Sequence, residues 1–203
     1  MPIRLINNCV QIEENRVIAL NRFPILVQNH LNHVPNTMQL ELQAVSLRQA
    51  DFPEEALKCF IQSVCRWGRR AGIATLVINN NAPLLIRQQF QRAIDGLNNV
   101  NLVTALSEIN RIRYLGRPSF ASKHLRFLRP EICPILDSLV SRNLFYDYTR
   151  EGYQQLSGDY GILIRALQLN GIGNPINREG GNWFAADIDM AIFAFLKEWT
   201  QPA

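Results

Sequence analysis

The stretch 115–142, LGRPSFASKHLRFLRPEICPILDSLVSR, gives the clearest local structure prediction in the chain. Gly116 is a helix stop signal, and Ser119 can cap a short helix that follows it. Proline residues interrupt that helix, and Asp137 can cap the next one. Lys123 then lies near the start of one helix and Asp137 at the start of the next, fourteen residues later. We therefore expect the two side chains to meet in one cleft.

The chain from residue 51 to its end is predicted to be a helical body, because apolar residues recur there at helical spacing. Gly72–Ile78 fits either a short strand or a buried helical turn, because β-branched residues favour a strand and the segment is too short to decide. The expected helices are Pro53–Arg69, Pro83–Leu97, Leu102–Leu115, Ser119–Leu128, Asp137–Tyr146, Tyr153–Leu169 and Ala185–Trp199. The fold class is therefore mainly α, a helical array.

Residues 1–50 show no clear helical period and are predicted to form an irregular N-terminal segment. Cys9–Ile12, Arg16–Leu20 and Ile25–Val27 favour β structure, and Asn- and Pro-containing breaks separate them. No Pro- or Ser-rich linker divides the chain. We expect one unit over 1–203, with residues 51–203 as its helical body and 115–144 as its Lys/Asp segment.

Composition limits the classes of protein. A chain of 203 residues with 47% hydrophobic and 19% charged residues can bury a sizeable core. No apolar run approaches the roughly 18–20 residues of a membrane span. Polar Asn7 and Asn8 stand where a signal peptide would need its apolar stretch. We expect no membrane partner and a cytoplasmic location.

The four cysteines form no CxxC pair, and no cysteine, histidine or carboxylate cluster accompanies His30 and His33. The sequence therefore predicts neither a disulfide framework nor a metal site, and it indicates no cofactor.

Basic residues are concentrated in one short segment. Between Arg111 and Arg129 there are six basic residues and no acidic one, whereas the rest of the chain carries 15 basic and 17 acidic residues. Such a segment can attract a phosphate backbone, although it also fits an ordinary solvated face. The residues expected to contact DNA are Arg113, Gly116, Arg117, Ser119, Ser122, Arg126 and Arg129. Arg66, Arg69 and Arg70 either extend this surface or stabilise the end of their helix.

A lysine beside an aspartate has a known chemical use. A lysine amine without its proton can attack the anomeric carbon of a nucleotide and form a Schiff base after the base departs. A carboxylate can stabilise the developing positive charge on the sugar and help to move protons. The alternative for Lys123 and Asp137 is a surface lysine and a helix-capping aspartate.

The segment 115–144 resembles the helix-hairpin-helix and Gly/Pro/Asp region of the DNA glycosylase superfamily, especially 8-oxoguanine glycosylases. The words FASKHL (120–125) and PILDS (134–138) are also similar to a compact bacterial group of 8-oxoguanine-glycosylase-fold proteins, some encoded in antiphage (CBASS-type) operons. The C-terminal stretch 183–190 resembles that group more weakly. The resemblance implies that Lys123 is the nucleophile, that Asp137 is the essential carboxylate, and that DNA is the partner.

The hairpin departs from the family pattern, because two glycines usually precede the lysine closely, whereas Gly116 lies seven residues upstream of Lys123. Three hypotheses therefore stay open. The first is a DNA glycosylase that excises a modified purine such as 8-oxoguanine, with an accompanying lyase step at an abasic site. The second is a non-excising protein of the same fold, with a nucleic acid, a nucleobase or a protein of the same defence operon as its partner. The third is a helical scaffold.

Two further residues are candidates for a base-binding pocket near the C-terminus. Trp183 could stack on a base, or it could anchor its glycine-rich loop to the core. Asp187 could contribute to the site, as could Asp189, or each could cap the first turn of the last helix.

Overall fold

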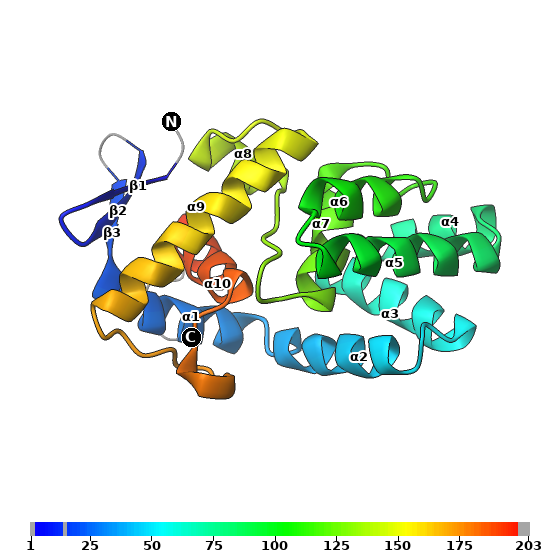
Figure 1. Cartoon of the computed structure of the whole chain (residues 1–203), viewed down its shortest axis with the longest axis horizontal. Coiled ribbons are helices and arrows are strands. Elements are labelled where there is room, and N and C mark those ends of the chain that lie inside the picture. Colours follow the sequence, from blue (N-terminus) through cyan, green and yellow to red (C-terminus); the bar gives the residue numbers. More distant parts are fainter. Residues whose placement is uncertain (1–2, 14–15, 199–203) are drawn as a thin grey trace.

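The computed structural model describes residues 3–13 and 16–198, and the chain is mainly α-helical, as predicted (Figure 1). Among these residues no helix combines the length and apolar character needed to cross a bilayer. The α-helices are α1 (Phe23–His33), α2 (Thr37–Gln49), α3 (Glu54–Trp67), α4 (Ala71–Asn80), α5 (Pro83–Asn98), α6 (Leu102–Asn110), α7 (Pro118–Leu128), α8 (Ser138–Leu144), α9 (Arg150–Leu169) and α10 (Ala185–Leu196). Short 3-10 helices occupy Leu20–Arg22 and Glu179–Gly181.

The N-terminal segment is more regular than predicted. Strands β1 (Arg4–Ile6), β2 (Cys9–Glu13) and β3 (Arg16–Ala19) form an antiparallel sheet in that order, which confirms the β structure expected at 9–12 and 16–20. The prediction of β structure at Ile25–Val27 is wrong, because these residues lie in α1.

Helices α1 and α2 replace the predicted irregular structure after the sheet. Pro24 lies in the first turn of α1, where a missing N–H costs nothing. Helix α2 buries Leu40, Ala44 and Leu47 at spacings of four and three residues, but it also buries Glu41. This charged residue on the inner face hides the apolar stripe of α2 from a reading of hydrophobic periodicity.

The helical body matches the expected elements, with several boundaries moved. Gly72–Ile78 lies in α4, so the open choice there is settled as helix. Helix α6 ends at Asn110, five residues before the expected Leu115, although Leu115 is fully buried in the following turn. The expected end of the last helix, Trp199, lies outside the described residues.

The caps of α7 and α8 differ from each other. The expected cap Ser119 lies inside α7, because Arg117 occupies the N-cap position and Pro118 the first turn. Asp137 caps α8 as predicted, and its side chain accepts hydrogen bonds from the N–H groups of Leu139 and Val140.

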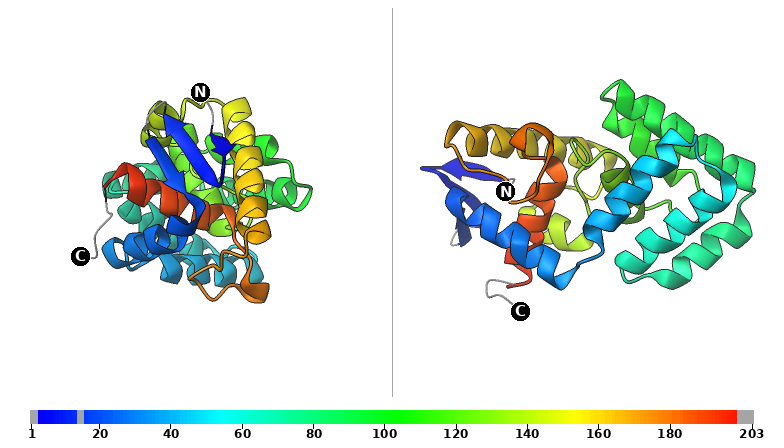
Figure 2. Two further views of the ribbon diagram at one scale, coloured as in Figure 1. Left: turned by 90° about the vertical axis from the view of Figure 1, so that its left-hand side faces the viewer. Right: turned by 90° about the horizontal axis from the view of Figure 1, so that it is seen from below.

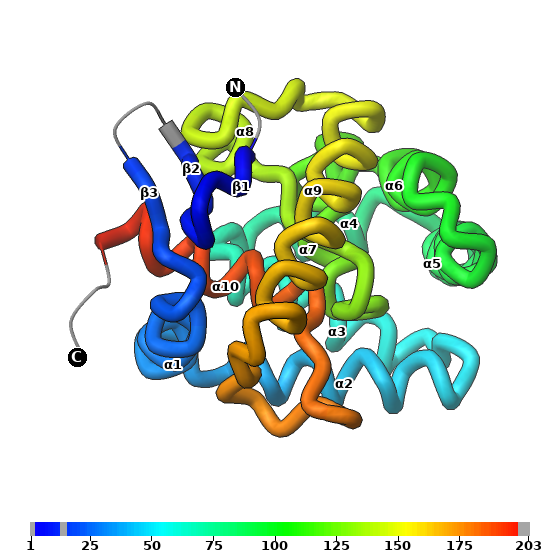
Figure 3. The backbone as a smooth tube through the Cα atoms, turned by 60° about the vertical axis from the view of Figure 1, so that its left-hand side comes forward, coloured from blue at the N-terminus to red at the C-terminus, as the bar shows by residue number. Residues whose placement is uncertain are grey.

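The helices gather in two groups that share one continuous hydrophobic core (Figures 1 and 2). Helices α2 to α7 form one group, in which α5 packs along α6. The sheet and helices α1, α8, α9 and α10 form the other, in which α1 packs against α10 and β2 lies beside α8 (Figure 3). The segment 129–137 crosses from α7 in the first group to α8 in the second, so it links the helix that carries Lys123 to the helix that Asp137 caps.

A cationic cleft around Lys123 and Asp137

A cleft of about 1660 Å³ opens between the two groups of helices. Its walls come from the α1–α2 connection, the turn between α3 and α4, the residues around the start of α7, the start of α8, and α10. This volume exceeds the roughly 300–1000 Å³ of an ordinary small-molecule pocket. The cleft therefore has room for part of a macromolecule.

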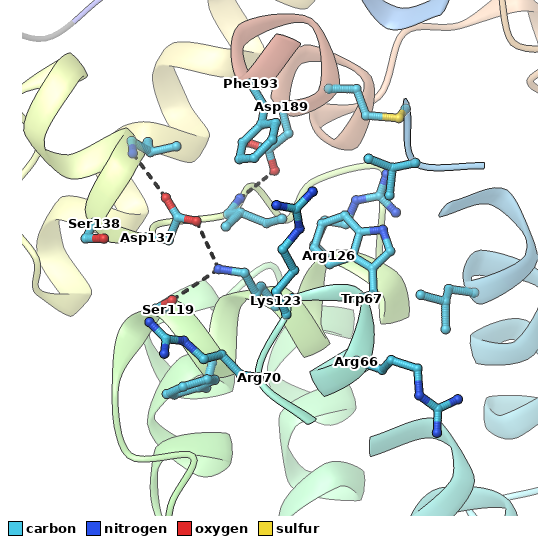
Figure 4. A pocket seen from close by; sticks show the side chains of 18 of the residues that line it. Arg66, Trp67, Arg70, Ser119, Lys123, Arg126, Asp137, Ser138, Asp189 and Phe193 are labelled. Atoms are coloured by element: carbon cyan, nitrogen blue, oxygen red, sulfur yellow. Dashed lines mark hydrogen bonds and ion pairs between the residues drawn. The ribbon is translucent and has the colours of Figure 1, made fainter. Parts of the chain in front are cut away.

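Lys123 and Asp137 meet in this cleft, as predicted (Figure 4). The Lys123 Nζ lies 3.0 Å from Asp137 Oδ2, and it also donates to the hydroxyl oxygen of Ser119 at 3.1 Å. The two side chains are 13% and 17% exposed. The amine is thus held by two partners and remains partly open to the cleft.

The two residues before Asp137 are hydrogen-bonded to both sides of the cleft, and this fixes the position of Asp137. The Leu136 N–H donates to the hydroxyl oxygen of buried Ser122 at 3.1 Å, and this pair is also fourteen residues apart. The Ile135 N–H donates to Asp189 Oδ2 from α10 at 2.6 Å (Figure 4). Ser122 therefore acts behind the Lys123–Asp137 pair, where its hydroxyl positions the crossing segment.

Asp137 stays ionised over the usual pH range. Burial works to raise its pKa, but the charge of Lys123 and the hydrogen bonds from Val140, Lys123 and Leu139 outweigh burial, and the pKa of Asp137 lies below its usual value. An ionised carboxylate in this position can stabilise a positive charge that develops near the amine.

The aliphatic part of Lys123 passes over Gly68, the residue that ends α3. A Cβ atom added at Gly68 would lie 3.3 Å from Lys123 Cδ and 3.6 Å from its Cε. The missing side chain at Gly68 leaves the space that the lysine stem uses.

Basic side chains outnumber acidic ones along the cleft. Among the residues that the structure describes, the acidic ones lining the cleft are Asp137 and Asp189. Burial raises the pKa of Asp189 to about 8, although Arg126, Tyr160 and the Ile135 N–H oppose the rise. The basic lining residues are Arg66, Arg69, Arg70, Arg117, Lys123, Arg126, Arg142 and Lys197. Eight basic side chains against two acidic ones give the cleft a strong positive charge.

The predicted DNA-contacting residues are divided by the structure. Gly116, Arg117 and Ser119 line the cleft beside Lys123. Arg113 and Arg129 are not among the lining residues. The guanidinium of Arg113 instead lies 5.1 Å from the ring of Tyr114, and Arg129 bonds to Asn98 and Glu131.

The prediction that Arg126 contacts DNA is corrected for a different reason, which is burial. Its side chain lines the cleft, but only 1% of it is exposed, and its Nη1 lies 2.7 Å from Glu41 Oε1. A guanidinium this deep does not contact the backbone of a polymer at the surface. Its Nη2 is buried without a hydrogen-bond partner among the described residues, so it could still receive a small anionic or carbonyl group that reaches the floor.

The start of α7 offers few free N–H groups to a phosphate. Pro118 has no N–H, and the N–H of Ser119 donates to the hydroxyl oxygen of Tyr148 at 3.0 Å. Those of Phe120 and Ala121 both donate to the Arg117 carbonyl. In other helices such N-terminal groups bind anions. Here they are occupied within the chain.

The two candidate pocket residues near the C-terminus lie elsewhere. Trp183 is 3% exposed, its ring packs edge-on against Phe23, and its indole N–H donates to the carbonyl of Ile172. Asp187 is fully buried, accepts from the N–H of Phe184 at the start of α10, and pairs with Arg178. The alternatives of a loop anchor for Trp183 and a helix cap for Asp187 are therefore confirmed.

Several cleft residues were missed or set aside by sequence reasoning. Arg142, Trp67, Tyr148 and Phe193 line the cleft, and no local motif marks them. Only the neighbouring Arg66, Arg69 and Arg70 carry a signal, as a basic cluster at a helix end. Asp189 does not cap α10; its Oδ1 accepts from the hydroxyl of Tyr160 and its Oδ2 from the Ile135 N–H.

Comparisons with known proteins give no relative: no protein-family model, no curated protein and no solved structure matches the chain.

Proposed function

We propose that the protein binds DNA in the cationic cleft and excises a modified purine such as 8-oxoguanine, with Lys123 as nucleophile and Asp137 as its carboxylate partner. The proposal includes a helical architecture of the helix-hairpin-helix glycosylase type. The observation that carries it is the Lys123–Asp137 pair, 3.0 Å apart in a large, positively charged cleft.

The pair can carry out the chemistry with atoms and protons in balance. Asp137 accepts a proton from the Lys123 ammonium, and the free amine attacks C1′ of the nucleotide. The bond between C1′ and the base breaks, and its electrons leave with the base, which takes the proton from Asp137. The amine nitrogen then releases a proton to O4′ as the sugar ring opens, which leaves a protonated Schiff base between C1′ and Nζ.

The held position of the amine supports this role. Ser119 and Asp137 each accept a hydrogen bond from Nζ, and Ser122 and Asp189 hold the segment that leads to Asp137. Preorganised groups of this kind lower a barrier because they need little rearrangement in the transition state.

Borohydride trapping tests the proposal, because reduction of a Schiff base leaves a stable covalent adduct. The substrates are labelled oligonucleotides that contain 8-oxoguanine or an abasic site, each offered both as a single strand and as a duplex. The chain has only three lysines, Lys58, Lys123 and Lys197. Lys123→Gln is therefore compared with the complete set of lysine controls, Lys58→Gln and Lys197→Gln, and the adduct is located by peptide mass spectrometry.

We expect an adduct that maps to Lys123, disappears in Lys123→Gln and persists in both controls. An adduct at another amine, or none on any substrate while nucleic-acid binding is intact, contradicts base excision through Lys123.

A second candidate function is a non-excising protein of the same fold, with a partner in an antiphage operon. The occupied N–H groups at the start of α7 favour it, because they leave the hairpin without its expected phosphate site. Retained nucleic-acid binding without trapping supports this candidate.

A further inference from the structure

The turn between α3 and α4 presents three arginines to the cleft. Arg66, Arg69 and Arg70 are exposed and line it, and none of them makes an ion pair within the part of the chain that the structure describes. Figure 4 shows Arg66 and Arg70 on the α3–α4 side of the Lys123 amine. These three side chains are called the arginine wall below.

The backbone of this turn holds the arginine wall in a defined place. The Gly68 N–H donates to the Val64 carbonyl, and the Arg70 N–H donates to the Cys65 carbonyl at 2.8 Å. Arg69 has a φ of 57°, a left-handed conformation in which glycine is usual. An arginine at this position costs stability, and Arg69 is one of the residues that line the cleft.

Aromatic side chains accompany the basic ones along the cleft. Trp67, Tyr114, Phe120 and Phe193 line it and are half-buried. Trp67 is fixed, because its indole N–H donates to Thr37 Oγ1 at 3.0 Å and its ring packs edge-on against Phe127. Basic residues that follow a backbone, together with aromatic rings on which bases stack, are the usual means of binding unpaired strands.

The features that would hold a duplex are weak in this chain. The N–H groups at the start of α7 are occupied, and two arginines expected on the DNA-binding face, Arg113 and Arg129, lie outside the cleft lining. The groups that remain to contact phosphates are therefore basic side chains that line the cleft, namely the arginine wall and Arg117.

From these observations we infer that the cleft receives nucleic acid as an unpaired single strand, with its phosphates on Arg66, Arg69 and Arg70 and its bases against the aromatic lining. The inference deepens the proposed function, because it rests on the nucleic-acid substrate of the same cleft and names the form of that substrate. An unpaired strand brings a base to Lys123 without the cost of opening a duplex.

Binding measurements by fluorescence anisotropy test the inference. The probes are a labelled single-stranded DNA of about 15 nucleotides, the same strand annealed to its complement, and an RNA of the same sequence. Affinities are measured over a range of salt concentrations. The test variant is Arg66→Gln/Arg69→Asn/Arg70→Gln, in which asparagine suits the left-handed backbone at position 69.

A matched control removes three exposed arginines that do not line the cleft: Arg92→Gln/Arg150→Gln/Arg165→Gln. Circular dichroism melting checks that both variants fold.

We expect the single strand to bind at least about tenfold more tightly than the duplex, because only the unpaired strand presents its bases to the aromatic rings. In the arginine-wall variant, the slope of log affinity against log salt should fall by about 2, since each of three contacts contributes roughly 0.7. The control variant should keep the wild-type slope. Duplex binding as tight as single-strand binding, an equal loss in the control, or no binding of any probe overturns the inference.

The inference and the proposed function can fail separately. Single-strand binding with no trapped adduct ends the proposal of base excision and leaves the inference standing. An adduct on duplex substrates with weak single-strand binding does the reverse. A preference for the RNA probe keeps the inference and changes the kind of strand.

Discussion

Two groups of charged side chains lie near each other and differ in how completely they are paired. In the buried network, Glu41 pairs with Arg126 and with Arg178, and Arg178 also pairs with Asp187; the four side chains are at most 8% exposed. In the cleft, Lys123 pairs with Asp137, and these two are 13% and 17% exposed. The buried network joins α2, α7 and α10, whereas the cleft pair joins the middle of α7 to the N-cap of α8.

The difference separates a structural use of charge from a chemical one. A buried ion whose partner is removed cannot return to water, so it strongly destabilises the fold. Asp137 would keep two backbone hydrogen bonds and partial access to water if Lys123 were lost. The buried network therefore holds elements together, and the cleft pair is free to serve a ligand.

The largest expected effect is the loss of Arg178. Arg178→Met leaves Glu41 and Asp187 buried with fewer partners, and we expect the free energy of unfolding to fall by about 3–5 kcal/mol. Lys123→Met should cost no more than about 1 kcal/mol, because the pair is partly exposed and Asp137 keeps its other bonds. Urea denaturation of the two variants measures both values. Equal losses would remove the distinction between the two groups.

His124, which follows Lys123 in α7, extends the comparison to the pH dependence of the free energy of unfolding. His124 is 1% exposed, and its ring packs edge-on against the rings of Phe60 and Phe90. Burial lowers the pKa of His124 to about 4 from 6.5, against the effect of a hydrogen bond between its Nδ1 and the carbonyl oxygen of Phe120; the charge of Lys123 lowers it further. Below pH 6.5 the unfolded chain therefore takes up this proton before the folded one does.

The stabilisation connected with His124 is thus complete above pH 6.5 and is lost as the pH falls toward 4. Over this window the wild type should lose about 3 kcal/mol more of its unfolding free energy than His124→Leu, at about 1.4 kcal/mol for each pH unit. Urea denaturation at pH 4, 5.5 and 7 gives the difference. Parallel curves for the two proteins would show that His124 already takes up its proton in the folded state.

The smallest effect concerns the space beneath Lys123. Gly68→Ala places a Cβ 3.3 Å from Lys123 Cδ, and the lysine stem has to shift while its amine is held by Asp137 and Ser119. We expect the rate of borohydride trapping to fall up to about fivefold, which corresponds to about 1 kcal/mol.

Gly72→Ala is the matched control, because no atom of the described residues lies within 4 Å of the added Cβ. It should leave the trapping rate unchanged and, since Gly72 lies within α4, raise the unfolding free energy by about 0.5–1 kcal/mol. A rate unchanged in Gly68→Ala would mean that the position of the lysine stem does not limit the reaction.

Local signals in the sequence were enough for most of the helical body. Pro83 begins α5, Asp137 caps α8, and the apolar spacing of α3 and α9 marks their inner faces. These features depend on neighbours within one or two turns, and residue type alone sets them. The N-terminal helices were missed because their burial depends on distant partners: α1 packs on α10, and Glu41 in α2 is neutralised by Arg126 and Arg178.

Short-range features of the sequence were enough to predict the mainly helical character, the basic segment before α8 and the spacing that brings Lys123 to Asp137, because each depends on local periodicity, capping or charge. Which charged side chains line the cleft could be seen only once the helices were packed together. Packing buried Arg126, left Arg113 and Arg129 outside the cleft lining, and placed the arginine wall and Lys123 on the same cleft. It also placed the hydroxyl of Tyr148 where it accepts the Ser119 N–H at the start of α7. Exposure and long-range pairing arise from packing between segments far apart in the chain, and no single segment encodes them.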